Sequence, residues 1–209
     1  MSTLSFCSDC CVRRDSKLEG AICVDKKIKA KEALVSDAIR QLTPMSQDEL
    51  FIRRFEQGDA DDVWHLHRAA SEGGARGPEG AWEDDLRNIS EVYIRSGGDF
   101  LTAHISSKLI AMGGLEPADS DVVQLKRMRV HPAFRRQGFG RRLLHELELR
   151  AVTLGFKWVA LDTTMIQVGA QKLYETAGYV RCKEGRLHGY SVIFYEKRLA
   201  DEGEARLNR

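Results

Sequence analysis

A strong amphipathic helix enclosed by two strands is the feature that most constrains the fold of this chain. Its apolar positions follow the spacing of one helix face: Leu143, Leu144, Leu147 and Ala151. Gly155 ends the run as a cap. The stretch before the helix, "DVVQLKRMRV", alternates like a strand, and the stretch after it, "FKWVALDTT", is almost continuously apolar. A strand–helix–strand unit implies parallel strands, and the apolar run predicts that the second strand is covered on both faces.

The remaining strands are predicted to pair antiparallel. "DFLTAHIS" and "KLIAMGGLEP" come directly before "DVVQLKRMRV", with tight turns between them, and "YVRCKE" and "YSVIFYEKRL" form a final pair. Strict alternation in "DVVQLKRMRV" predicts one face made of Val122, Gln124, Lys126, Met128 and Val130. The other face then consists of Val123, Leu125, Arg127 and Arg129.

Three further helices and a first strand complete the pattern. "LFIRRFE" is expected as a short strand and "GDADDVWHLHRAASEGG" as an amphipathic helix. "AWEDDLRNISEVYIRSG" is expected as a second helix with an apolar face made of Trp82, Leu86, Ile89, Val92 and Tyr93. A later helix that stops at Gly178 has a face made of Ala170, Leu173, Tyr174 and Ala177. The order β-α-α-β-β-β-α-β-α-β-β predicts an α/β fold with a mixed, mainly antiparallel sheet and flanking helices.

The 209 residues suit one domain with appended ends. We expect the domain over residues 49–199, after a partly disordered leader with one helix (1–48) and before a tail (200–209). Four of the five cysteines lie in the leader, where Cys7 and Cys10 have half the spacing of a zinc site and no second pair follows. We therefore expect reduced thiols and no metal. The absence of a signal peptide and of an apolar run long enough to span a bilayer predicts a cytoplasmic protein with no membrane contact.

The formal net charge of +1 gives the chain no overall attraction to nucleic acid or anionic lipid, so any electrostatic site is local. The local candidate is "VHPAFRRQGFGRRLL". A triphosphate-binding P-loop is excluded because no GK[ST] follows, and a dinucleotide loop would need glycine where Leu143 stands.

What is left is the pattern Arg135-x-x-Gly138-x-Gly140 between a strand and a helix. The first N–H groups of a helix are unpaired and favour an anion such as a pyrophosphate. Glycine at 138 and 140 fits this use, because a Cβ would keep a phosphate away from the backbone. The alternative is that the glycines only make the turn and the arginines form a solvated face.

Two motifs at this spacing resemble the GCN5-related N-acetyltransferase (GNAT) superfamily. Arg135 to Gly140 match the pattern [Q/R]-x-x-G-x-[G/A], and "AQKLYETAGY" matches A-x-x-LYE-x-x-G-[FY]. The resemblance covers about residues 51–199, and it implies a GNAT-type sheet with a splayed parallel strand pair. It also implies an acyltransferase that uses acetyl-CoA.

The resemblance implies specific site residues. The cofactor-binding residues are Met128, Arg129, Val130, Arg135, Arg136, Gln137, Gly138, Phe139, Gly140, Arg141 and Gln167. Met128 to Val130 are expected along the pantetheine arm, Arg136 to Arg141 around the pyrophosphate, and Gln167 where many relatives have asparagine. Tyr174 matches the tyrosine that protonates the CoA sulfur, and its alternative role is that of a core tyrosine.

The general base and the acceptor stay open at this level. Gln124 stands where some relatives have a glutamate base, so Glu116, Asp162 or a chain of waters are the options. His131 occupies a turn position. We expect the primary amine of a small molecule as the acceptor, with protein lysines or N-termini, or a non-catalytic acetyl-CoA-binding module, as alternatives. An acidic stretch raises the hypothesis of a cationic acceptor: Glu72, Glu79, Glu83, Asp84 and Asp85. A homodimer is neither required nor excluded.

Overall fold

The computed structural model describes residues 50–71 and 83–199. The predicted leader with its four cysteines, the predicted tail, and the residues Glu72, Glu79 and Trp82 lie outside the described residues.

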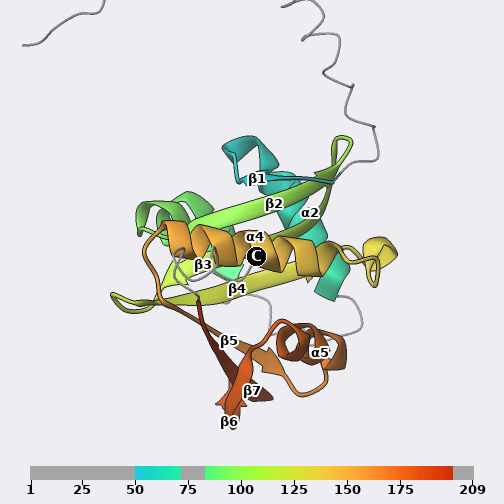
Figure 1. Cartoon of the computed structure of the whole chain (residues 1–209). Coiled ribbons are helices and arrows are strands. Elements are labelled where there is room, and N and C mark those ends of the chain that lie inside the picture. Colours follow the sequence, from blue (N-terminus) through green and yellow to red (C-terminus); the bar gives the residue numbers. More distant parts are fainter. Residues whose placement is uncertain (1–49, 72–82, 200–209) are drawn as a thin grey trace, which may run out of the picture. The chain divides into compact units, whose positions relative to one another are not determined.

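One seven-stranded sheet organises the described residues (Figure 1), with the order β1-β2-β3-β4-β5-β7-β6. Its strands are β1 (Leu50–Arg54), β2 (Asp99–Ile105), β3 (Lys108–Pro117), β4 (Val122–Val130), β5 (Trp158–Thr164), β6 (Val180–Leu187) and β7 (Tyr190–Arg198). The pair β4 and β5 is parallel, and the other neighbouring strands are antiparallel. The predicted mixed sheet with one crossover is confirmed.

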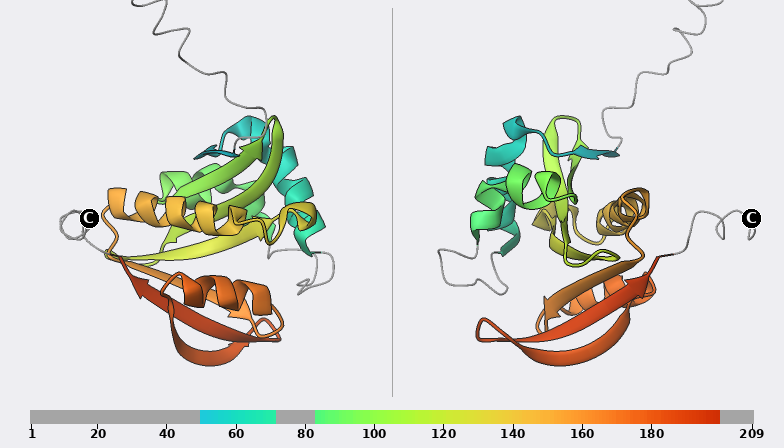
Figure 2. Two further views of the ribbon diagram at one scale, coloured as in Figure 1. Left: turned by 45° about the vertical axis from the view of Figure 1, so that its right-hand side comes forward. Right: turned by 90° about the vertical axis from the view of Figure 1, so that its left-hand side faces the viewer.

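Helices cover both faces of this sheet, as the two views of Figure 2 show. The helical elements are η1 (Gln57–Asp59), α2 (Ala60–Ser71), α3 (Asp84–Arg87), η3 (Ser90–Arg95), η4 (Pro132–Phe134), α4 (Phe139–Thr153) and α5 (Val168–Thr176). Apolar residues of α4 and α5 join one core cluster with the strands, and those of α2 and η3 join a second one. The sheet therefore separates two cores. No helix within the described ranges is both long and apolar enough to cross a membrane.

The second predicted helix is wrong as a single element. The structure has a four-residue α3, a break at Asn88, and then η3, which has π-helical geometry. Asn88 donates its side-chain amide to the carbonyl of Asp84 at 3.0 Å, which is the competition with the backbone that disfavours Asn inside helices. The predicted apolar face survives the break, because Leu86, Ile89 and Tyr93 are all buried in one core.

The predicted alternation of β4 is also wrong beyond Lys126. The pairing with β3 shifts between Met112 and Gly114, so that β4 carries one residue more than β3 in that interval. Arg127 lies in this bulge with a φ of 55°, in the left-handed region. The bulge reverses the faces that follow. Met128 and Val130 therefore pack in the same core as Val123 and Leu125, whereas Arg127 is bonded to α3 on the other side.

The parallel pair separates soon after it forms. β4 and β5 are paired only from Val122–Trp158 to Gln124–Ala160, and the strands then diverge. β5 is buried on one face, with Val159 and Leu161 inside, whereas Asp162 on the other face is only partly covered. The prediction that this strand is covered on both faces is therefore wrong, because its second face opens on the gap between the strands.

Candidate active site

A cavity of about 740 Å³ lies where β4 and β5 diverge. Five parts of the fold supply its walls: the end of α2, the start of α3, β4, β5 with α5, and the β6–β7 hairpin. The ionisable side chains among its lining are His67, Glu83, Asp85, Lys126, Arg127, Arg129, Asp162, Tyr174, His188 and Tyr190. Residues separated by more than 100 positions in sequence thus meet at one opening.

Backbone groups of β4 face this opening. The N–H of His131 donates to Ile110 on β3 at 2.8 Å. Because successive residues of a strand point their N–H groups to opposite edges, those of Met128 and Val130 point away from β3, towards the gap. Sheet pairing with β5 has ended at Gln124, so these groups are available to an extended ligand.

The loop between β4 and α4 is held by Arg135. Its Nε donates to the carbonyl of Val130 at 3.1 Å, and its Nη2 donates to the carbonyl of Ala70 at 2.8 Å. The side chain therefore ties the loop to the end of β4 and to the last turn of α2. His131 caps the short η4 turn, with its Nδ1 accepting from the N–H of Ala133 at 3.2 Å, and this contact is a structural one.

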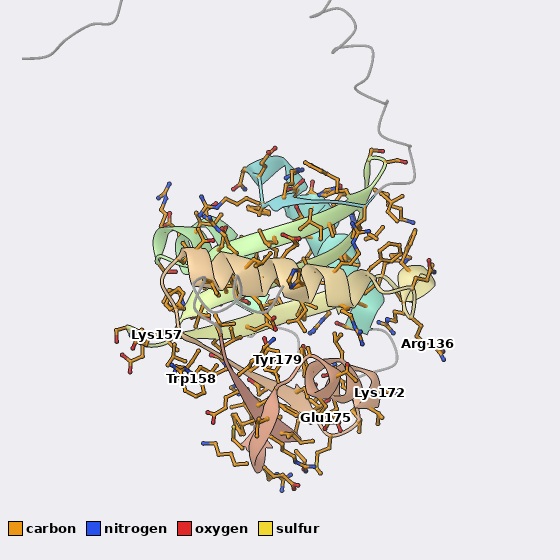
Figure 3. All side chains as sticks on the ribbon, viewed as in Figure 1. Arg136, Lys157, Trp158, Lys172, Glu175 and Tyr179 are labelled. Carbon is orange, nitrogen blue, oxygen red and sulfur yellow. The ribbon has the colours of Figure 1, made fainter. Side chains whose placement is uncertain are left out.

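The loop then turns into α4 through two residues of left-handed backbone. Arg136 has a φ of 61° and Gly138 has a φ of 88°. Figure 3 shows Arg136 at the outer end of this loop, and its side chain is exposed. Left-handed and right-handed residues in alternation make a concave turn of N–H groups that suits an anion.

The start of α4 offers further N–H groups. The first bond to the helix start runs from the N–H of Arg142 to the carbonyl of Gly138 at 3.1 Å, which leaves the N–H groups of Phe139, Gly140 and Arg141 without partners inside the helix. A Cβ on Gly138 would meet nothing within 4 Å. A Cβ on Gly140 would lie 3.4 Å from Val130 and 3.6 Å from Leu173, which is ordinary van der Waals contact, so packing alone does not require glycine at either position.

Tyr174 points its polar end at the cavity from α5. The side chain is buried, with its ring 5.7 Å from that of Tyr179 and 6.2 Å from that of Tyr195. Burial raises the pKa of Tyr174 to about 12, and the positive charge of Arg129 opposes this rise. The hydroxyl makes no hydrogen bond within the part of the chain that the structure describes. Tyr174 is thus both a core residue and a wall of the cavity.

Two glutamines orient polar groups of β5. Gln124 donates from Nε2 to Oδ1 of Asp162 at 3.3 Å. Gln167, which precedes α5, accepts at Oε1 from the hydroxyl of Thr163 at 2.8 Å. Burial raises the pKa of Asp162, with the charge of Lys126 and the Gln124 hydrogen bond partly offsetting the effect. Asp162 faces the cavity, whereas Glu116 is ion-paired with Lys126.

Asp85 and Arg127 form a bidentate ion pair in the cavity wall. Nε and Nη2 of Arg127 donate to the two oxygens of Asp85 at 2.7 and 2.6 Å, and Tyr93 donates its hydroxyl to the same carboxylate. Burial alone would raise the pKa of Asp85, but the hydrogen bonds and charge of Arg127 outweigh it and hold this pKa below its ordinary value. The pair fastens α3 to the bulge of β4.

A histidine and a glutamate close the same wall. Nε2 of His67 lies 3.0 Å from Oε1 of Glu83, and the histidine is buried. Burial, followed by the charge of Arg129, lowers the pKa of His67, while Glu83 opposes the change. Glu83 and Asp85 both have partners, and Asp84 is exposed outside the cavity lining. The described part of the predicted acidic stretch therefore brings no unpaired carboxylate to the cavity.

The structure brings Met128, Arg129, Gln167 and Tyr174 into the cavity lining, whereas Val130 and Arg135 to Arg141 are not part of that lining. Sequence reasoning missed His67 and the pairing of Arg127 with Asp85. The polar Asp162 inside an apolar strand was a usable signal, whereas the bulge at Arg127 has none in the hydropathy pattern. No group of three potential metal ligands occurs within residues 50–71 and 83–199.

Comparison with known proteins defines the class. Residues 60–179 match the model of the acetyltransferase (GNAT) family. The chain therefore belongs to the GNAT acetyltransferase family, as the two motifs predicted.

Two relatives and one solved structure are similar to parts of this chain. Human N-acetyltransferase 8 is 31% identical over 101 residues, covering 46% of this chain and 44% of the relative. Human N-acetylaspartate synthetase is 30% identical over 103 residues, covering 48% of this chain and 34% of the relative. The chain thus aligns with less than half the length of each. The structure of yncA from Salmonella typhimurium with acetyl-CoA has the same fold, with a TM-score of 0.62 at 17% identity over 73% of this chain and 95% of that one.

The Asp85–Arg127 pair predicts a pH-dependent loss of stability in Asp85→Asn. The substitution keeps the shape but leaves a half-buried guanidinium without its counter-ion, at a cost of about 3 kcal/mol near neutral pH. Because the folded-state pKa of Asp85 is depressed, its contribution exists above the unfolded pKa and is lost as the pH falls through the folded one. Urea unfolding from neutral to acidic pH measures this.

A matched control is Asp121→Asn, which removes the exposed pair with Lys157 at 3.0 Å. Exposed pairs contribute less than about 1 kcal/mol. Equal losses in the two variants, or a difference from the wild type that does not shrink on acidification, would contradict the assignment.

Proposed function

We propose that residues 49–199 form an acetyl-CoA-dependent N-acetyltransferase domain that transfers the acetyl group to the primary amine of a small molecule. The observation that carries this is the cavity between β4 and β5, which is lined by Tyr174, together with the N–H groups at the start of α4 that have no partner inside the helix. Membership of the GNAT family and the acetyl-CoA bound in the yncA structure support the choice of cosubstrate.

The residues present suit that cosubstrate. The N–H groups from Gln137 to Arg141 would hold the pyrophosphate, because the helix start and the left-handed turn direct them outwards and a helix N-terminus favours negative charge. The N–H groups of Met128 and Val130 would hold the amide-rich pantetheine arm in the manner of an added strand. Arg135 would support the loop rather than bind the cosubstrate, since its guanidinium is engaged with two carbonyls and its N–H donates to the carbonyl of Pro132.

Gly138→Glu is predicted to abolish acetyl-CoA binding. A carboxylate at the start of α4 would repel the pyrophosphate, and the φ of 88° adds strain. Gly155→Glu is the matched control, because Gly155 has a φ of 91°, equally open surroundings, and a place at the far end of the same helix. Calorimetry should show loss of affinity in the first variant only. Unchanged affinity in Gly138→Glu would remove this loop from the cofactor site.

Tyr174 is proposed as the general acid. Acetyl-CoA supplies an acetyl thioester that an amine can attack, and the CoA sulfur then requires a proton. With a pKa of about 12, the phenol of Tyr174 is protonated at neutral pH and holds that proton at the cavity wall. Arg129 lies close enough to influence this pKa, and its positive charge would stabilise the phenolate left after transfer.

Tyr174→Phe is predicted to lower kcat by about 100-fold or more while leaving acetyl-CoA affinity unchanged. Tyr179→Phe is the control, because Tyr179 is a buried neighbour whose ring contacts Tyr174 but which does not line the cavity. Steady-state kinetics with calorimetry separates the two effects. Full activity of Tyr174→Phe would assign Tyr174 to the core alone.

Asp162 is proposed as the base that takes the proton of the amine. Gln124 cannot accept a proton, but its amide holds the carboxylate of Asp162 from the neighbouring strand. Burial raises the pKa of Asp162, which makes it a stronger base than an exposed aspartate. In some relatives a glutamate on β4 is the general base, and here Asp162 on β5 would take that role.

Asp162→Asn is predicted to lower kcat/KM for the acceptor by about 100-fold. In the wild type, kcat/KM falls as the pH drops through the raised pKa of Asp162, and the variant should lose this acidic limb. The double variant Gln124→Glu with Asp162→Asn restores a carboxylate hydrogen-bonded to an amide, and partial rescue is expected. Full activity of Asp162→Asn would contradict the assignment of Asp162 as the base and would favour a chain of waters in that role.

A small-molecule acceptor is preferred to a protein on two grounds. The cavity is bounded by side chains from α2, α5 and the β6–β7 hairpin, and one of the relatives is named for an acetylated amino acid. CoA release with a panel of small amines and of peptides chooses between the two classes. Retained acetyl-CoA binding with no turnover on either panel would favour the non-catalytic alternative.

A further inference from the structure

The charged side chains of the cavity fall into two groups. Two ion pairs join opposite charges, Arg127 with Asp85 and Lys126 with Glu116, and Glu83 is hydrogen-bonded to His67, whose pKa is lowered. Arg129 and Asp162 differ from these, since neither forms an ion pair within the part of the chain that is described. Arg129 is thus a cation of the cavity wall without a counter-ion, and Asp162 is a carboxylate whose printed hydrogen bond comes from the neutral amide of Gln124.

Arg129 is held in place by its own strand. Its Nη1 donates to the carbonyl of Met128 at 3.0 Å, and this is its one hydrogen bond among the described residues. The bulge at Arg127 puts Arg129 opposite Met112, on the sheet face covered by α2 and η3 rather than the face covered by α4. Four of the five guanidinium N–H groups are therefore left for a ligand on this face.

The surroundings of Arg129 make the binding of an anion to its guanidinium more favourable. Burial is the main cause that lowers its pKa, and the positive charge of Arg127 acts in the same direction. Arginine nevertheless keeps its proton in proteins, so the partly buried side chain stays a cation. Such a charge is costly until an anion pairs with it, and a planar carboxylate can accept two parallel hydrogen bonds from a guanidinium.

We propose that the acceptor of this enzyme is an amine that also carries a carboxylate, in the manner of an α-amino acid, and that Arg129 binds this carboxylate. The inference rests on the proposed acetyl transfer and names its substrate class. Asp162 receives the amine end of the same molecule, because this carboxylate lines the cavity, forms no ion pair among the described residues and lies near Tyr174. Both residues influence the pKa of Tyr174, so the carboxylate and the amine are bound close to the group that acts on the CoA sulfur.

The obvious competing use of Arg129 is a phosphate of CoA. The unpaired N–H groups proposed for the pyrophosphate lie at the start of α4, on the opposite side of the sheet from α2. Arg129 instead shares a wall with His67 and Ser71 of α2. This position favours the acceptor. The loop before α4 is nevertheless near, because Arg135 is bonded to Ala70 of α2 and its charge lowers the pKa of Arg129.

The test compares L-α-amino acids with their α-carboxamides, which keep the amine and the side chain but lack the charge. Wild-type protein, Arg129→Gln, Arg129→Lys and the control Arg198→Gln are assayed for CoA release. Arg198 is exposed and pairs in register with Trp158, at the end of β5 remote from the cavity. Thermal unfolding of each variant verifies that it is folded.

The wild type is expected to use its best amino acid at least about 10-fold more efficiently than the matching amide, as for a charge-assisted hydrogen bond. Arg129→Gln should raise the KM for the acid by about 10- to 100-fold, erase the preference and leave the KM for acetyl-CoA unchanged. Arg129→Lys should retain part of the preference, and Arg198→Gln should retain all of it.

Several results would overturn the inference without touching the proposed function. They are equal use of acids and amides by the wild type, a preference that survives in Arg129→Gln, and a rise in the KM for acetyl-CoA alone. No turnover with any amine would defeat the proposed function instead. Calorimetric titration of the amino acids into the CoA-loaded protein then decides. Binding that is lost in Arg129→Gln supports the carboxylate site, and no binding to the wild type refutes it.

Discussion

The early end of pairing between β4 and β5 is the constraint on which the rest of the site depends. Two parallel strands that stayed hydrogen-bonded along their length would have no backbone groups to offer and no space between them. Here the pairing stops at Gln124–Ala160, and the left-handed bulge at Arg127 bends β4 away. One irregular stretch of strand thereby creates the cavity and exposes the N–H groups of Met128 and Val130.

Opening a sheet in this way has a cost that the fold offsets with charge. The bulge is held by Asp85, which accepts two hydrogen bonds from Arg127 and one from Tyr93. Because Asp85 pairs with Arg127, Arg129 is the arginine of β4 that is left without a counter-ion. The chemical character of the cavity, with Arg129 and Asp162 unpaired, is thus a consequence of how the opening is stabilised.

Much of the architecture was predictable because it follows from periodicity. The α4 face from Leu143 to Ala151 and the succession of strands required only spacing, and the glycine pattern before α4 led to the correct family. The faces of β4 beyond Lys126 were not predictable, because the bulge lies in the polar stretch "KRMR", where burial leaves no pattern. Asn88 broke a helix through a local hydrogen bond that propensity alone does not locate. Arg129 has no counter-ion because Asp85, more than 40 positions away in the sequence, pairs with Arg127 instead.

Arg135 links two parts of the fold near the cavity. One guanidinium connects the loop before α4 to the last turn of α2, through the carbonyls of Val130 and Ala70. The loop follows the end of β4, and α2 supplies His67 and Ser71 to the cavity wall. A displacement of the loop or of α2 therefore changes the hydrogen bonds of the same planar guanidinium. A ligand that moved the loop would therefore also act on the part of the cavity wall that α2 supplies.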